Sequence, residues 1–126
     1  MKLSVTLLSV ALVLAANLAQ GQAPVDLLPL GKEIFLSHCA DCHRANGQGL
    51  PHTFPALAKN PFVVGDASPV IATVLNGRRG QLGRMPSWRD KLDDNQIAAV
   101  VTYIRQAWGN RAAPVTPVLV APLRKK

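Results

Sequence analysis

The sequence predicts a small all-α domain with three to five short helices, and three observations lead to this class. Apolar residues recur at helical spacing in three separate segments. The stretches between these segments are rich in glycine and proline, which is typical of loops. No parallel-sheet pattern and no internal repeat is visible, and 126 residues are too few for more than one ordinary domain.

The N-terminal segment has the pattern of a secretory signal peptide. Lys2 is followed by no charged residue until Asp26, and residues 3–18 are mostly Leu, Val and Ala. Small residues then offer cleavage after Gly21, or after Ala23 as the second choice. The alternative is an uncleaved anchor, since about 20 apolar residues can span a bilayer.

This pattern divides the chain into three parts. Residues 1–21 are the expected signal peptide, residues 22–109 the domain, and residues 110–126 a tail. The domain is therefore expected in the periplasm. The tail contains three prolines and ends in three basic residues, so we expect it to be extended or mobile: Pro114, Pro117, Pro122, Arg124, Lys125, Lys126.

The first expected helix begins near Leu30 and runs through His38, with Ile34 and Phe35 on its apolar face. Glycines and prolines then predict a loop over residues 44–58. A second helix is expected from Ser68, which would cap it ahead of Pro69. Its apolar face and its glycine stop are Val70, Ile71, Val74, Leu75 and Gly77.

Residues 78–88 are expected to be irregular, and the clearest helix follows them from Asp94 to Trp108. Asp93 and Gln96 have the spacing of a capping box, and Gly109 supplies the stop. Its buried stripe is expected to contain Ile97, Val100, Val101, Ile104 and Trp108.

The motif Cys39-Ala40-Asp41-Cys42-His43 is the attachment signature of a c-type haem, and it contains both cysteines of the chain. Each thiol can form a thioether to a haem vinyl group, and His43 then lies under the iron as an axial ligand. A disulfide of the thioredoxin type is an alternative, but it needs alternating strands and helices. A zinc site is another, but it needs four ligands.

Met85 is the candidate for the sixth iron ligand. It is the only methionine outside the expected signal peptide, and it lies in a loop rich in Gly, Arg and Pro. A thioether stabilises Fe(II), so His/Met ligation raises the reduction potential. The alternative is a core methionine that fills an irregular gap. His38 and His52 are poorly placed to compete and are expected at the surface.

Over residues 29–109 the chain resembles the class I cytochromes c. The matching pieces, in order, are Gly31-x-x-x-Phe35, the haem motif, Phe54-Pro55-Ala56-Leu57, Met85-Pro86 and the helix containing Tyr103. The Gly-Gln-Gly loop, the Met-Pro segment and Trp108-Gly109-Asn110 are similar to haem domains of the cytochrome c subunit of alcohol or aldehyde dehydrogenases. Those subunits carry three such domains, and this chain has room for one.

The resemblance implies a small cytochrome c fold around one covalent haem c, with further roles for named residues. The backbone carbonyl of Pro55 would accept from the ring N–H of His43, and Leu57 and Leu82 would cover the haem plane. Gly31 and Phe35 would meet the last helix near Tyr103. Since Arg side chains match carboxylates, Arg78, Arg79, Arg84 or Trp88 could bind the haem propionates; the alternatives are a solvated loop for the arginines and a core aromatic for Trp88.

The expected function is that of a periplasmic, monohaem, His/Met one-electron carrier, and not of an enzyme. Without residues 1–21 the chain keeps 13 Lys and Arg against 7 Asp and Glu. This charge fits redox partners with acidic docking surfaces and ordinary solubilising charge about equally well. No basic stripe with interleaved aromatics points to nucleic acid. Two alternatives are a haem subunit of a membrane-bound dehydrogenase or oxidase complex and a ligand-binding haem sensor.

Overall fold

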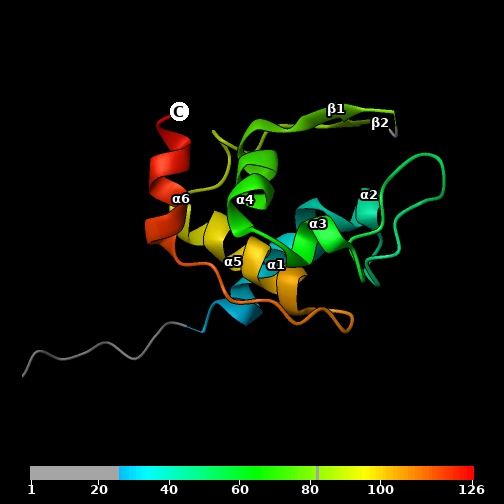
Figure 1. The fold of residues 1–126 in the computed structure, drawn as a ribbon, viewed down its shortest axis with the longest axis horizontal. Coiled ribbons are helices and arrows are strands. Elements are labelled where there is room, and N and C mark those ends of the chain that lie inside the picture. The colour runs from blue at the N-terminus through cyan, green and yellow to red at the C-terminus, as the bar shows by residue number, and fades with distance from the viewer. Residues whose placement is uncertain (1–25, 82) are drawn as a thin grey trace, which may run out of the picture.

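The structure is a computed structural model that describes residues 26–81 and 83–126. The expected signal peptide, its cleavage sites and Leu82 lie outside the described residues. The described part contains six helices and one two-stranded hairpin (Figure 1). In chain order these are α1 Leu27–His38, α2 Ala40–His43, α3 Pro61–Val64, α4 Ala67–Asn76, β1 Arg78–Gly80, β2 Gly83–Met85, α5 Asp94–Gln106 and α6 Pro117–Arg124. The all-α class is confirmed, with two one-turn helices and α6 beyond the segments expected.

Helices α1 and α5 cross at the centre of the fold (Figure 1). A Cβ atom on Gly31 would lie 2.1 Å from the carbonyl oxygen of Ala99, so only glycine allows this crossing. Beside it, the Phe35 ring is fully buried and lies 5.5 Å from the ring of Tyr103 and 5.0 Å from that of Trp108, centroid to centroid. The expected contact of Gly31 and Phe35 with the helix that contains Tyr103, which is α5, is confirmed.

Helix α5 has the capping box expected at Asp93 and Gln96. It ends at Gln106, however, two residues before the expected end at Trp108. Ala107 is extended and Trp108 has a φ of 55°, so the chain turns there. The turn lets the Trp108 indole N–H donate to the carbonyl of Ala45, 2.9 Å away, while the ring packs on Phe35. Trp108 therefore lies outside α5, where it joins the Ala45 backbone to the Phe35 ring.

Helix α4 begins at Ala67 and is capped by Asp66, not by Ser68 as expected. The Asp66 carboxylate accepts a hydrogen bond of 3.0 Å from the backbone N–H of Ser68. The four apolar residues of its expected face are buried, and Gly77 ends it as predicted. The following stretch is not irregular but forms the antiparallel hairpin β1–β2, in which Arg78 pairs with Met85.

The tail was expected to be extended, and this expectation is wrong for residues 117–124. They form α6, which packs on α4 and α5. Pro117 occupies the first turn, where a missing N–H costs nothing, and Val115 and Val120 supply fully buried side chains. The Thr102 hydroxyl donates to the Val115 carbonyl and accepts from its N–H, which fixes the approach to the helix.

None of the helices in residues 26–81 and 83–126 combines the length and the apolar character that crossing a membrane requires.

Candidate functional site

A cavity of about 560 Å³ lies between the α1–α2 region, the loop after α2, α4, the hairpin and α5. The six site residues expected from the sequence all line it: Cys39, Cys42, His43, Pro55, Leu57 and Met85. Residues from five separate parts of the chain therefore meet around one space. Most of the remaining lining is aliphatic or aromatic.

The haem motif reaches the cavity because the chain passes almost directly from α1 into the one-turn helix α2. The backbone N–H of Cys39 still bonds to the carbonyl of Phe35, and that of His43 bonds to the carbonyl of Cys39, both at 2.9 Å. One helical turn thus carries the two cysteines and the histidine to the same cavity. The cysteines are free and half-buried, with no disulfide between them.

The His43 ring is oriented by the loop that follows it. His43 is 9% exposed, and its Nδ1 lies 2.9 Å from the carbonyl oxygen of Pro55. Since a carbonyl can only accept, Nδ1 carries the proton and donates it to this bond. The neutral tautomer then has its lone pair on Nε2, which is the nitrogen available to a metal.

Burial changes the acidity of the Cys39 thiol. Burial, and then the proximity of Cys42, raises the pKa of the Cys39 thiol to about 11. In the folded chain the free Cys39 sulfur is therefore kept as the uncharged thiol. A thioether sulfur carries no charge and avoids the cost of burying a thiolate. Among residues 26–81 and 83–126, no three His, Cys, Asp or Glu side chains are grouped to hold a metal ion.

Met85 lies at the end of β2, half-buried, and also packs against the hydrophobic core. Its position depends on Gly77, which has a φ of 73°. A Cβ atom there would lie 2.5 Å from the Met85 carbonyl oxygen and 2.8 Å from the Pro86 carbonyl carbon. The end of α4 can therefore press directly against the Met-Pro backbone only because residue 77 is glycine.

Asn110 is a site-supporting residue whose role the sequence motifs alone did not reveal. It is 4% exposed, its amide donates to the carbonyls of Leu57 and Ile104, and its Oδ1 accepts from the N–H of Lys59 at 2.7 Å. It thereby ties the Leu57 loop to the end of α5. The Trp-Gly-Asn sequence alone does not indicate this role, because Leu57 and Lys59 lie more than 50 residues away from Asn110 in the chain.

The other histidines differ in position. His52 is exposed and has a φ of 61°, and it does not line the cavity. His38 is exposed too, but it contributes to the cavity lining, with its ring centroid 5.1 Å from that of Trp88. Both are surface residues, as the sequence predicted.

The charges around the cavity have one sign. Its charged lining residues are Arg78, Arg79 and Arg84, and no Asp or Glu is among them. Arg78 also lies over the ring of Phe62, at 5.4 Å from the centroid. An apolar cavity with three guanidinium groups at its border suits a flat apolar group that carries carboxylates. Haem has that chemistry, and the two cysteines and His43 supply its attachment groups.

Comparison with known proteins identifies the family that the sequence motifs resemble, the c-type cytochromes. Residues 27–104 match the family described as "Cytochrome C oxidase, cbb3-type, subunit III". Cytochrome c-552 of Thermus thermophilus is 35% identical over 133 residues, which cover 92% of this chain and 84% of that protein. Cytochrome c6 of Tetradesmus obliquus is 38% identical over 89 residues, which cover 67% of this chain and 96% of that protein.

A dehydrogenase subunit is also similar. The cytochrome c subunit of the quinone alcohol dehydrogenase of Gluconobacter oxydans is 34% identical over 90 residues, covering 65% of this chain but 19% of the subunit. The chain thus spans about a fifth of that relative's length. The crystal structure of the c-type cytochrome XoxG from Methylobacterium extorquens AM1 superposes with a TM-score of 0.53 at 20% identity, covering 80% and 66% of the two chains, and shows the shared fold.

The family carries covalently bound haem c, and the two cysteines and the histidine stand where this attachment needs them. The chain therefore belongs to the cytochrome c family, whose members are haem c electron-transfer proteins.

Proposed function

We propose that the chain is a periplasmic one-electron carrier with a single haem c, attached through Cys39 and Cys42 and ligated by His43 and Met85. The observation that carries the ligand assignment is the hydrogen bond between His43 Nδ1 and the Pro55 carbonyl, in a cavity whose lining also includes Met85. Met85 is the only methionine beyond residue 21. A neutral imidazole and a neutral thioether are the ligand pair of high-potential c-type haems.

The bound haem would supply the Fe(III)/Fe(II) couple. The residues of this chain hold its surroundings constant while the charge changes. Pro55 fixes the tautomer of His43 and makes its Nε2 more basic. Gly77 presses the Met85 backbone into place, and the aliphatic lining excludes water. His43 and Met85 would both hold the iron, so the haem would supply electron transfer and offer a substrate no open coordination site.

The ferric absorption spectrum tests the ligand assignment. The wild-type protein is expected to show the near-infrared sulfur-to-iron charge-transfer band, and Met85→Ala is expected to lose it. The matched control is Val118→Ala, which shortens a side chain 78% exposed on α6. Rapid CO binding by the unmodified reduced protein would instead support a ligand-binding sensor.

The compartment belongs to the same proposal. It is supported by the signal-like pattern of residues 1–21, with its single positive charge and apolar run. N-terminal sequencing of haem-containing protein from a periplasmic extract tests it. A new N-terminus at residue 22 or 24 is expected, and an N-terminus at Met1 in the membrane fraction would contradict it.

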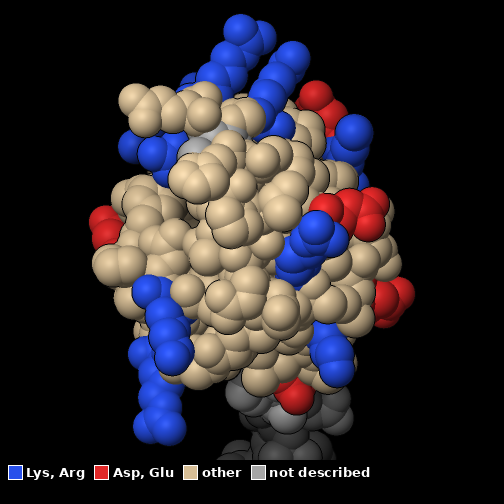
Figure 2. Space-filling model, turned by 90° about the vertical axis from the view of Figure 1, so that its right-hand side faces the viewer, with Lys and Arg blue, Asp and Glu red and all other residues tan. Residues whose placement is uncertain are grey.

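For partners, we propose proteins with acidic docking surfaces. Figure 2 shows the face on the side of α2 and the hairpin tip, where basic side chains project around a broad uncharged centre and several acidic side chains lie at its edge. Arg79 and Arg84 are exposed and pair directly across the hairpin. Like charges in this register repel each other unless an anion lies between them. Neither has a carboxylate partner in the described residues, so each can meet the haem propionates or the acidic side chains of a partner protein.

A second candidate is a haem subunit of a dehydrogenase or oxidase complex. It is favoured by the similarity to cytochrome c subunits of the quinone alcohol dehydrogenase and of gluconate 2-dehydrogenase. Copurification separates the two roles. A subunit remains with a dehydrogenase or oxidase through mild detergent extraction and gel filtration, whereas a free carrier elutes alone.

A further inference from the structure

The segment from Pro86 to Asp93, here called the connecting segment, joins Met85 to α5. One side of it is held by the end of α4. The Ser87 hydroxyl donates to the carbonyl of Leu75, and the backbone N–H of Trp88 donates to that of Val74 at 3.1 Å. Met85 and the connecting segment together are here called the Met85 loop. These bonds have to break when the loop moves away from the cavity.

The other side of the connecting segment is held by Arg124 of α6. Its Nη2 donates to the Leu92 carbonyl at 2.8 Å, and its Nη1 donates to the Arg89 carbonyl. Its Nε forms an ion pair with the Asp94 carboxylate at 2.6 Å. One guanidinium therefore binds both the connecting segment and the first turn of α5.

Arg89 makes the reverse connection. Its guanidinium donates to the backbone carbonyl of Arg124 and to the Asn76 side chain at the end of α4. Arg89 and Arg124 together, here called the arginine clasp, link α4, α5, α6 and the connecting segment. Since each residue donates to the carbonyl of the other, the clasp depends on α6 being docked.

Helix α6 has little stability of its own. It has eight residues and contains Pro122, which has no N–H to donate within the helix. It is docked by Val120, which is fully buried, and by Leu123, which packs on the core. The helix thus forms where it is docked, and its docking brings Arg124 to the connecting segment.

We propose that α6, through Arg124, is a positioning element that keeps the Met85 loop closed over the haem. This inference rests on the proposed ligation by Met85. Arg124 does not line the cavity, so it acts only through the connecting segment. Without the clasp, one side of that segment loses its partners, so that only its bonds to α4 remain to be broken and the loop opens more often.

The test measures binding of imidazole to the ferric haem, because imidazole enters only when Met85 leaves. Arg124→Gln is expected to bind imidazole about tenfold faster than wild type, the factor that corresponds to about 1.4 kcal/mol or one charged hydrogen bond. Its charge-transfer band should disappear at a lower temperature than its far-UV circular dichroism signal. A chain that ends at Thr116 is expected to show a larger change in the same direction.

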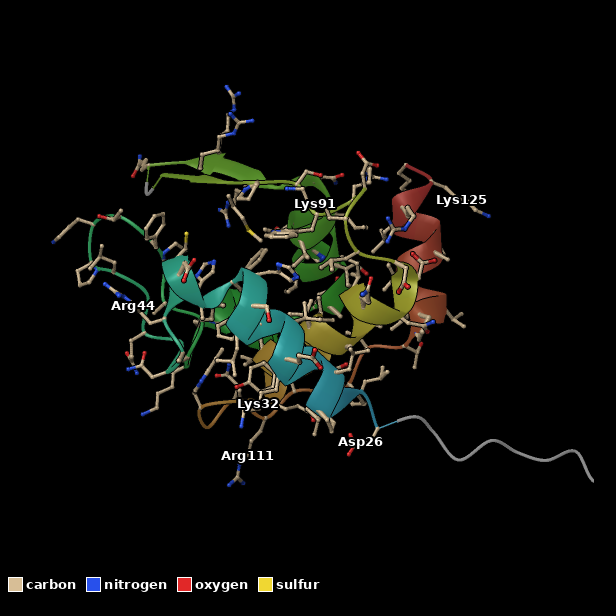
Figure 3. All side chains as sticks on the ribbon, turned by 180° about the vertical axis from the view of Figure 1, so that it is seen from behind. Asp26, Lys32, Arg44, Lys91, Arg111 and Lys125 are labelled. Carbon is tan, nitrogen blue, oxygen red and sulfur yellow. The ribbon has the colours of Figure 1, made fainter. Side chains whose placement is uncertain are left out.

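Lys125→Gln and Arg111→Gln are the controls, because both remove a positive charge from an exposed side chain that points away from the body of the protein (Figure 3). If Arg124→Gln binds imidazole at the control rate, or loses its band only together with its helical signal, the inference is overturned. If the wild type has no charge-transfer band, the ligand assignment fails first, and the inference fails with it.

Discussion

Gly77 and Gly80 lie at the two ends of strand β1, yet the structure requires glycine only at the first. Gly77 has a φ of 73°, and a Cβ atom there would clash with the Met85 carbonyl oxygen at 2.5 Å. Gly80 has no positive φ, and a Cβ atom on it would meet no neighbour within 4 Å. At the scale of single residues, a glycine therefore sets the position of the proposed distal ligand.

We predict that Gly77→Ala destabilises the protein by about 2 kcal/mol or more, because alanine is strained at positive φ and pushes against the Met85 backbone. Urea unfolding followed by circular dichroism measures this change, and the ferric charge-transfer band should weaken in the same variant. Gly80→Ala is the matched control and should stay within about 0.5 kcal/mol of wild type. Equal effects of the two substitutions would show that Gly77 has no special role.

Single residues with strong chemistry were predictable from the sequence, and their supports were not. The two cysteines and the histidine of the haem motif and Met85 are identified by residue type, spacing and scarcity, and these four residues line the cavity. Asn110 and Gly77 act through contacts with segments that local patterns do not connect to them. A sequence pattern reports which residues are neighbours along the chain, while these roles depend on neighbours in space.

At the scale of elements, long amphipathic helices were predictable and short or proline-containing elements were not. The buried faces of α1, α4 and α5 were predictable from the spacing of their apolar residues. The hairpin has strands of three residues with no alternation, so it leaves no signal. Helix α6 was missed because Pro122 lies inside it, and its docking through Val120 and Leu123 compensates for that proline.

Arg105 connects α5 to the end of α3 and to the segment before α6. It lies on α5, is 4% exposed, and donates to the carbonyls of Val63 and Gly65, both at 2.8 Å, and to that of Ala113 at 3.1 Å. Arg105→Ala would leave buried carbonyls without donors, so we expect a loss of about 3 kcal/mol in the free energy of unfolding.

Chemical denaturation of the haem-containing protein measures this loss. Arg111→Ala removes an exposed arginine six residues further on and should change the stability by no more than about 0.5 kcal/mol. A similar small effect for Arg105→Ala would mean that water replaces its three hydrogen bonds and that the end of α3 does not depend on it.

At the scale of the whole molecule, the net positive charge is expected to steer anionic partners to the face with the hairpin. Oxidation of the reduced protein by an anionic iron cyanide complex should slow as salt is added, because the Debye length falls from about 30 Å at 0.01 M to about 10 Å at 0.1 M. The double variant Arg79→Glu, Arg84→Glu should react up to about tenfold more slowly at low salt.

The control for steering is a variant with the same change in net charge at distant sites, Arg111→Glu with Lys125→Glu. Stopped-flow rates with a cationic ruthenium ammine complex should change in the opposite direction for the hairpin variant. If both double variants slow the anionic reaction equally, only net charge matters, and the hairpin is not the docking surface.

In the proposed function, one haem with His43 and Met85 as ligands exchanges one electron. A spectroelectrochemical titration of the purified protein tests it most directly. We expect a single one-electron transition at a high potential, with the sulfur-to-iron charge-transfer band present at the oxidised end and absent throughout the titration of Met85→Ala. A low-potential transition in a wild type without that band would contradict the account.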